Sequence, residues 1–194
     1  LFCVLFLINA FNYFDGIDGS LSITVISVII ILYFLTSDND IKLFLIIFLI
    51  PILIFLLFNF GLFNLPKLFL GDNGSLLIGF LVSFILIFYA NQKLVHPILL
   101  AWSVAIFVYE FLSINLERLI NKKHLFGAGL DHLHHKLLKK NKSILLTDFL
   151  LFVINIILFI IGYASFKIIN SAASLILFIF FFIIFYYIKK KIFS

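Results

Sequence analysis

Long apolar segments separated by short polar breaks are the feature that most constrains how this chain can fold. The first of these segments ends near Ile8. The other six cover residues 21–35, 43–60, 76–90, 95–112, 146–166 and 171–188. A helix needs about 20 mostly apolar residues to cross a hydrocarbon layer of about 30 Å. With 64% hydrophobic and 12% charged residues, the chain cannot be an ordinary water-soluble domain. We therefore expect an all-α, polytopic integral membrane helical bundle, with six full transmembrane helices plus one partial N-terminal span.

The polar breaks alternate between short, chemically plain ones and longer ones that carry motifs. The plain breaks are residues 36–42, 91–93 and 167–170, and the richer ones are residues 9–20, 61–75, 113–143 and 189–194. Because a serpentine chain alternates faces, the two kinds should lie on opposite faces of a membrane. Of the 14 Lys and Arg residues, 11 lie in the richer breaks: Lys67, Arg118, Lys122, Lys123, Lys136, Lys139, Lys140, Lys142, Lys189, Lys190 and Lys191. The positive-inside rule then predicts that the richer breaks face the cytoplasm.

The distribution of charge and cysteine limits other interpretations. Topology alone is sufficient to explain the basic tail Lys189–Lys191. No basic region stands free of the apolar segments, so nucleic-acid binding has no support. The single cysteine, Cys3, excludes an internal disulfide. The chain has no Met and begins inside an apolar run, so we expect a single membrane domain over residues 1–194 that forms the C-terminal portion of a longer protein.

The first polar motif is NAFNYFDGIDGS, residues 9–20. Its polar side chains recur at every third position, namely Asn9, Asn12, Asp15 and Asp18. On a helix such a series would form a slowly drifting stripe, but Gly16 and Gly19 interrupt it and indicate a helix end that opens toward a ligand. A helix-terminating turn, with Ser20 capping the next helix, is the simpler alternative. Ionisable groups at membrane depth are costly and usually face a cavity or a site, which favours a functional motif.

The second motif is FLGDNGS, residues 69–75. Taken alone, it is typical of a turn with good N-cap chemistry before the apolar run from Leu76. Asp72 also offers a hard oxygen ligand of the kind that Mg²⁺ prefers, and Gly71 and Gly74 leave room for a phosphate close to the backbone. The two interpretations are compatible, since a helix N-terminus itself favours anions.

The third motif is HLHH, residues 132–135, in the longest and most basic polar segment. The imidazoles of His132, His134 and His135 suggest zinc, but no Cys stands nearby and the cytoplasmic carboxylates suit Mg²⁺ better. The imidazoles can instead donate hydrogen bonds to phosphate oxygens. A positive field surrounds them, from Arg118, Lys122, Lys123, Lys136, Lys139 and Lys140. A solvated His-rich loop without a function is the remaining alternative.

All three motifs fall on the face predicted to be cytoplasmic. Carboxylates for a divalent cation, His and Arg for phosphates, and membrane helices for a lipid together predict phosphate chemistry at the membrane surface. A transporter or channel is the rival class, and it predicts polar residues in the middle of the spans. The spans are instead nearly uniformly apolar, with exceptions such as Asn155.

In this order, the three motifs resemble those of the polyprenyl-phosphate N-acetylhexosamine-1-phosphate transferases of glycosyltransferase family 4. The likeness covers nearly the whole chain, and its HxHH form is more similar to the undecaprenyl-phosphate N-acetylglucosamine-1-phosphate branch than to the phospho-N-acetylmuramoyl-pentapeptide branch. It implies a multi-pass protein of the bacterial inner membrane with its active site on the cytoplasmic face. The implied reaction moves a sugar-1-phosphate from a UDP-N-acetylhexosamine to a polyprenyl phosphate, releases UMP and initiates a surface glycan.

The resemblance also assigns roles to the matching positions. It implies that Asp15 and Asp18 are catalytic carboxylates and that Asp72 is a ligand of an Mg²⁺ cofactor, with Mn²⁺ as an alternative. The implied substrate-binding residues are Asn9, Asn12, Arg118, His132, His134 and His135. The implied partners are the UDP-sugar, the polyprenyl phosphate and the lipid bilayer, with a homodimer as an open alternative and no nucleic acid. Glu110 falls where the N-acetylglucosamine branch often carries Asp.

The chain departs from the family pattern in two places. The aspartate-rich motif that precedes the first motif in the family is absent, in keeping with the expected N-terminal truncation. Gly129 stands where the family usually has Asp, and Asp131 lies beside His132 instead. A muramoyl-pentapeptide-type activity, or an inactive fragment of such an enzyme, therefore stays open beside the transfer of N-acetylglucosamine-1-phosphate.

Overall fold

The computed structural model describes residues 1–122 and 132–193. In these ranges the elements are α1 Phe2–Asn12, α2 Ser20–Leu35, α3 Asn39–Asn59, the 3-10 helix η1 Leu62–Asn64, α4 Gly71–Asn91, α5 Pro97–Ser103, α6 Ala105–Ile120, α7 Leu133–Asn141, α8 Ile144–Ile168 and α9 Ser171–Phe193. The described ranges contain no strand, so the all-α fold class is confirmed. Lys123, Gly129 and Asp131, which were considered above, lie outside the described residues.

Four helices are long and apolar enough to cross a membrane, namely α3, α4, α8 and α9. Helices α5 and α6 make a fifth candidate only if they count as one span, because a bend of 73° separates them. Helices α1 and α2 are apolar but have only 11 and 16 residues. The predicted count of six full spans and one partial span is therefore not confirmed, because the described residues provide four or five. A continuous apolar run does not reveal where a helix breaks or how short it is.

The bend between α5 and α6 leaves backbone groups without helical partners, and Asn155 on α8 pairs with them. Its Oδ1 accepts a hydrogen bond from the N–H of Ile106 at 3.5 Å, and its Nδ2 donates to the carbonyl of Ser103 at 3.0 Å. Nδ2 also donates to Oγ of Ser27 on α2 at 2.8 Å. Irregular backbone inside a membrane bundle requires such partners. Asn155, a polar residue in an otherwise apolar span, therefore stabilises the break between α5 and α6.

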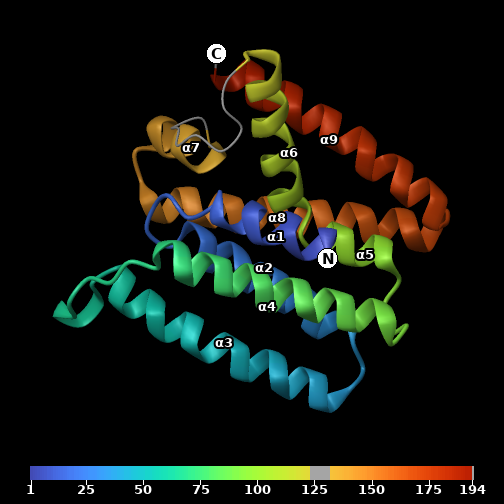
Figure 1. The fold of residues 1–194 in the computed structure, drawn as a ribbon, viewed down its shortest axis with the longest axis horizontal. Helices are drawn as coiled ribbons and strands as arrows, with labels where there is room; N and C mark the ends of the chain where they lie inside the picture. The colour runs from blue at the N-terminus through green and yellow to red at the C-terminus, as the bar shows by residue number, and fades with distance from the viewer. Residues whose placement is uncertain (123–131, 194) are drawn as a thin grey trace.

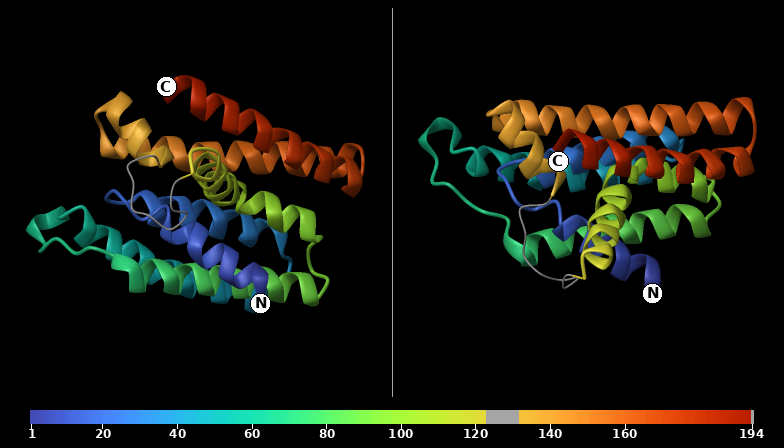
Figure 2. Two further views of the ribbon diagram at one scale, coloured as in Figure 1. Left: turned by 45° about the horizontal axis from the view of Figure 1, so that its top comes forward. Right: turned by 90° about the horizontal axis from the view of Figure 1, so that it is seen from above.

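The helices that carry the motifs meet at one end of the bundle. Helix α1 packs against α4, and α2 packs against both α8 and α3. Figure 1 shows α6 crossing the direction of these helices, and Figure 2 shows α9 running back along α8. The α1–α2 link, the α3–α4 link and α7 lie at one end, whereas the α2–α3, α4–α5 and α8–α9 links lie at the other (Figure 1). The alternation of rich and plain breaks is thus reproduced in space.

Aromatic packing fixes the end of α1 against α6. The rings of Phe11 and Phe107 stack with centroids 4.0 Å apart, and the ring of Phe14 lies 4.5 Å from that of Phe107. All three side chains are fully buried. Buried aromatic pairs of this kind add to the stabilisation from area burial alone. The segment that follows α1, which carries the first motif, is therefore attached to a rigid anchor.

Candidate active site

The first motif folds as a helix end followed by a tight link, residues 13–19, between α1 and α2. Asp15 and Asp18 lie in this link, so a helical stripe does not form. Gly19 ends the link with a φ of +79°, a left-handed conformation that glycine adopts without steric cost. The turn interpretation expected Ser20 to cap α2, but Ser20 makes no capping hydrogen bond. Its Oγ donates to a backbone carbonyl of the link at 2.6 Å and so closes the turn on itself.

The second motif forms the first turn of α4 rather than a turn before it. The helix begins at Gly71, five residues ahead of the expected start at Leu76. Asp72 is the acidic residue of this first turn, where the helix dipole favours a negative charge. Nδ2 of Asn12 donates to Oδ1 of Asp72 at 3.5 Å and to Oγ of Ser75 at 3.2 Å. The first two motifs are therefore in direct contact.

Asp15 and Asp72 lie close enough for their charges to interact. Burial, followed by the negative charge of Asp72, raises the pKa of Asp15 from 3.8 to about 6. A bound cation would stabilise two such carboxylates. Mg²⁺ commonly uses one or two carboxylates, water and substrate phosphates, and this oxygen pair fits that set. Among the residues that the structure describes, no three His, Cys, Asp or Glu side chains are grouped to hold a metal ion, so a cation would need further oxygen ligands.

Asp18 has different surroundings from Asp15. Its Oδ2 forms an ion pair with Nζ of Lys67 at 2.5 Å. Asp148 on α8 is fully buried beside Gly19 and is near enough to Asp18 for the two carboxylates to repel each other. Within the described ranges, neither oxygen of Asp148 has a hydrogen-bond partner. Sequence reasoning missed Asp148, although an acidic residue near the start of an apolar helix is a recognised signal of a site.

A pocket of about 240 Å³ lies between the link, the end of α3 and the start of α4. Its lining includes Asp15, Asp18, Ser22, Phe55 and Asn59. Asn59 holds two sides of the pocket together, because its Oδ1 accepts from the N–H of Gly19 at 2.7 Å and its Nδ2 donates to the carbonyl of Leu68 at 2.8 Å. Sequence reasoning missed Asn59 as well, although it is the only polar side chain in the predicted apolar span over residues 43–60.

The third motif stands at the start of α7, a helix that the sequence did not predict. The side chain of His134 is 1% exposed, and its ring, with that of His135, fills the space that a Cβ on Gly16 would need. The centroids of the three imidazole rings lie 4.3 to 6.1 Å apart. Burial lowers the pKa of His134 well below 6.5, and the charges of His135, His132 and Lys189 lower it further. Neither ring nitrogen of His134 has a hydrogen-bond partner among the described residues.

Arg118 and Asn9 lie at the edges of this group. The guanidinium of Arg118 lies over the ring of Tyr13 at 5.5 Å, and its Nη1 donates to the hydroxyl of Tyr13 at 3.4 Å. The Tyr13 ring meets His132 edge-on at 5.3 Å. The amide of Asn9 donates to the carbonyl of Leu5 in its own helix at 2.7 Å. The described contacts therefore join Arg118 to the third motif and leave Asn9 with α1.

Lys189 corrects the interpretation of the basic tail. Its side chain is 1% exposed and forms an ion pair with Oε2 of Glu110 on α6 at 2.8 Å. Topology alone therefore does not explain this lysine. The neighbouring Lys190 is exposed, and the sequence offers no signal that separates the two.

Comparison with known proteins supports the same family. Residues 1–90 match the model of Glycosyl transferase family 4. The chain is 32% identical over 145 residues to the undecaprenyl-phosphate alpha-N-acetylglucosaminyl 1-phosphate transferase of Yersinia pestis, and 32% identical over 146 residues to that of Escherichia coli (strain K12). Each of these matches covers 72% of this chain and 40% of the relative. No solved structure gives a significant match.

A relative of the other branch is also similar. The chain is 30% identical over 178 residues to the phospho-N-acetylmuramoyl-pentapeptide-transferase of Borrelia duttonii (strain Ly), a match that covers 82% of this chain and 49% of the relative. The chain thus spans less than half the length of these curated relatives. Its apolar helices and its bacterial relatives indicate a multi-pass inner-membrane protein. By the family model over its first 90 residues and by these relatives, the chain belongs to glycosyl transferase family 4.

Proposed function

We propose that this protein transfers N-acetylglucosamine-1-phosphate from a UDP-sugar to undecaprenyl phosphate, with release of UMP, to begin a surface glycan. The observation that supports it most is the contact of the first motif, residues 9–20, with both other motifs. Asn12 donates a hydrogen bond to Asp72, and Gly16 packs against His134. Relatives named for this activity are 32% identical to the chain over 145 and 146 residues. The motif-bearing end of the bundle would face the cytoplasm, since most of the Lys and Arg residues belong to its segments.

The reaction replaces one phosphoanhydride by another. An oxygen of the lipid phosphate bonds to the sugar-bearing phosphorus of the UDP-sugar, and the bond from that phosphorus to the UMP oxygen breaks. A phosphate monoester has a second pKa of about 6, so near neutral pH the nucleophile is already largely a dianion and requires no general base. Its approach to a negatively charged diphosphate is opposed by repulsion. The protein must therefore align the two reactants and neutralise charge.

Asp15 and Asp72 would hold Mg²⁺, or Mn²⁺ in its place, against the diphosphate. When bound, the cation would supply positive charge to the reacting phosphate oxygens and to the leaving group. The amide of Asn12 orients the Asp72 carboxylate. Asp18 would be the second catalytic carboxylate, since it lines the same pocket as Asp15 and pairs with Lys67.

The imidazoles would bind the nucleotide sugar. His134 is held neutral by its low pKa, so one of its ring nitrogens carries a proton that it can donate. Both ring nitrogens are buried, so a phosphate oxygen would reach them only after the ring moves away from Gly16. His132 and His135 stand beside it on the same helix end. Arg118, placed through Tyr13, would contribute positive charge to the same region. Asn9, which bonds to its own helix here, would need a rotamer change to reach a ligand.

An assay of membranes that contain the protein, expressed from its complete reading frame, tests the proposal. We expect radiolabelled UDP-N-acetylglucosamine, undecaprenyl phosphate and Mg²⁺ to give a chloroform-soluble labelled product together with UMP, and chelation by EDTA to stop it. A product formed only from UDP-N-acetylmuramoyl-pentapeptide would assign the protein to the other branch, which the Borrelia relative represents. No lipid product from any UDP-N-acetylhexosamine would refute the proposed activity.

A further inference from the structure

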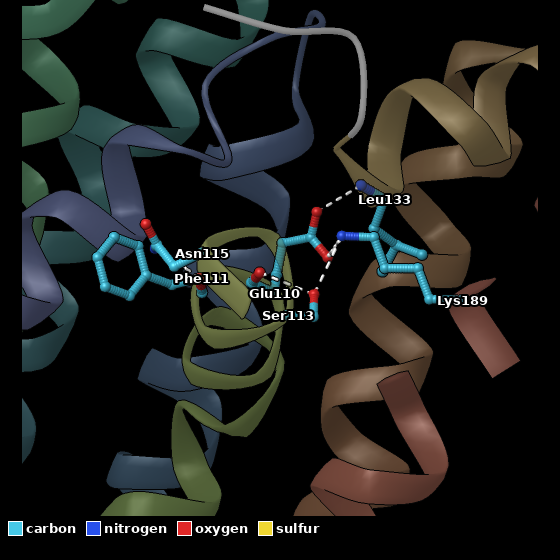
Figure 3. A network of polar contacts seen from close by, with 6 residues as sticks. All are labelled: Glu110, Phe111, Ser113, Asn115, Leu133 and Lys189. Carbon is cyan, nitrogen blue, oxygen red and sulfur yellow. Dashed lines mark hydrogen bonds and ion pairs between the residues drawn. The ribbon is translucent and has the colours of Figure 1, made fainter. Parts of the chain in front are cut away.

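A buried polar network joins α6, α7 and α9, three helices that come from distant parts of the chain. One carboxylate oxygen of Glu110 accepts a hydrogen bond from the backbone N–H of Leu133 at 2.6 Å, and the other forms an ion pair with Nζ of Lys189 at 2.8 Å. Lys189 also donates to Oγ of Ser113 at 3.1 Å. Figure 3 shows the Glu110 carboxylate directed between Leu133 and Lys189. A single side chain of α6 thus connects both other helices.

The network is almost wholly excluded from solvent. The side chains of Glu110 and Lys189 are 0% and 1% exposed, and Ser113 is also fully buried. Removing one charge from such a pair leaves the other buried and uncompensated, which is strongly destabilising, whereas neutralising both is tolerated far better. A buried pair therefore contributes less to overall stability than to a defined arrangement of the groups that it joins.

Glu110 caps the N-terminus of α7, a helix whose own N-cap residue makes no capping hydrogen bond. The N-cap residue of α7 is His132, and its side chain makes no capping hydrogen bond. The first backbone N–H groups of a helix have no partner within the helix. Glu110 accepts from one of them, at Leu133, and its negative charge suits the positive end of the helix dipole. Helix α7 is thus capped from α6, by a carboxylate that Lys189 holds in place.

The capped residue stands inside the third motif. Leu133 lies between His132 and His134 in the sequence, so a constraint on its backbone also limits where both imidazoles can lie. The ring of His134 packs on Gly16 in the link. The ring also experiences the charge of Lys189, which adds to burial and to the neighbouring imidazoles in lowering its pKa.

We propose that Glu110 and Lys189 form a clasp that holds the first turn of α7 against the link, residues 13–19, and that Lys189 is a positioning residue for nucleotide-sugar binding. The clasp acts through Leu133 and contacts no substrate. This proposal rests on the proposed function only for the identity of the ligand that the imidazoles bind. The positioning of α7 by the clasp is a property of the fold and does not depend on that identity.

Two neighbouring lysines provide a matched test. Lys189→Met and Lys190→Met each remove one positive charge from α9, but only Lys189 is buried and paired. Lys189→Met should lower kcat/KM for UDP-N-acetylglucosamine about 100-fold, the effect expected when a binding group is displaced by about 1 Å. The loss should arise mainly in the KM for this substrate and leave the KM for undecaprenyl phosphate unchanged. Lys190→Met should match the wild type in both.

Hydrogen exchange of the α7 amides in detergent gives a readout that does not depend on activity. Lys189→Met should increase the exchange rate over Leu133–Asn141, and Lys190→Met should not. The double variant Glu110→Gln/Lys189→Met removes both charges and keeps an oxygen that can accept from Leu133. It should recover most of the wild-type exchange protection and KM, because no uncompensated charge is left.

Each outcome bears on the clasp. Equal exchange rates in Lys189→Met and Lys190→Met would overturn it, as would a double variant that is no better than Lys189→Met alone. If the exchange rates follow the expected order but the wild type transfers no sugar phosphate, the clasp stands and the proposed function fails. Should Lys189→Met not fold, the double variant decides: wild-type exchange supports the clasp, and an unprotected α7 refutes it.

Discussion

Gly16 in the link between α1 and α2 packs directly against the imidazole of His134 at the start of α7. No side chain larger than hydrogen fits between them, because a Cβ on Gly16 would collide with Nε2 of His134. This contact joins the aspartate-bearing link to the histidine motif, and Asn12, directly before the link, donates a hydrogen bond to Asp72 of the second motif. The position of the histidine motif relative to the first motif therefore depends on this glycine.

Gly16→Ala should weaken nucleotide-sugar binding. The added methyl group would displace the His134 ring, and overpacking of this kind costs about 1–3 kcal/mol, equivalent to a loss of affinity of about 5–150-fold. The KM for the UDP-sugar measures this effect. Gly61→Ala is the matched control, since its φ of +61° strains an alanine but its nearest neighbouring atom is 3.8 Å from the added Cβ. The control should lose stability without a change in KM, and an unchanged KM in Gly16→Ala would contradict the contact.

Stability should depend on the charge of His134 in a defined direction. Its pKa in the folded protein lies well below 6.5, so at pH values below about 6.5 the unfolded chain binds more protons than the folded one. The contribution of His134 to stability is therefore complete above that pH and is lost progressively as the pH falls. Asp15, whose raised pKa acts in the opposite direction, is present in both the wild type and His134→Gln, so the two proteins are compared with each other. Between about pH 7.5 and about pH 5.5 the thermal midpoint of the wild type in detergent should drop relative to that of His134→Gln.

The control for this pH dependence is Asn170→Ala. Asn170 lies at the other end of the bundle, where its Oδ1 accepts from the N–H of Ala173 in the first turn of α9, and an amide does not titrate. The substitution should reduce stability at both pH values and leave the wild-type difference between them intact. A His134→Gln variant with the full wild-type difference would show that another group titrates.

Asp72→Asn should strongly reduce metal-dependent transfer and leave membrane insertion unchanged, because one ligand charge is lost without a change in shape. Loss of one electrostatic contact to the reacting groups costs about 100- to 1,000-fold in kcat. Turnover against Mg²⁺ concentration is the measurement. Asp40→Asn, an exposed acidic residue in the first turn of α3, is the control and should retain activity. Metal-dependent turnover at the wild-type level in Asp72→Asn would argue against the assigned ligand.

Asn155→Leu should destabilise the bundle at the break between α5 and α6. The substitution leaves the N–H of Ile106 and the carbonyl of Ser103 without this partner in a buried region, and each unsatisfied group costs about 1–3 kcal/mol. Unfolding followed by circular dichroism in detergent measures the loss. Asn170→Ala removes only an exposed cap of α9 and should cost about 1 kcal/mol. Similar losses in the two variants would show that the break is satisfied in another way.

The sequence by itself determined the class of the fold and the location of the motifs. Apolar runs identify membrane helices because hydropathy is a local property, and the observed α2, Ser20–Leu35, differs from its predicted range of residues 21–35 by one residue. The positions of Asp15, Asp72 and His134 in three breaks of the same kind also predicted that they would meet at one end. Their meeting is what the structure shows, whereas their chemical roles stay predictions.

Only the tertiary structure decided which polar groups have partners. Lys189 and Lys190 are equivalent in sequence, yet one is buried against Glu110 and the other is exposed. The bend after Ser103 is likewise invisible in a continuous apolar run, because Asn155, which satisfies it, lies on a different helix. Hydropathy records the environment that each residue prefers, but hydrogen bonds and ion pairs depend on which distant segments pack together, and that is settled only when the helices assemble.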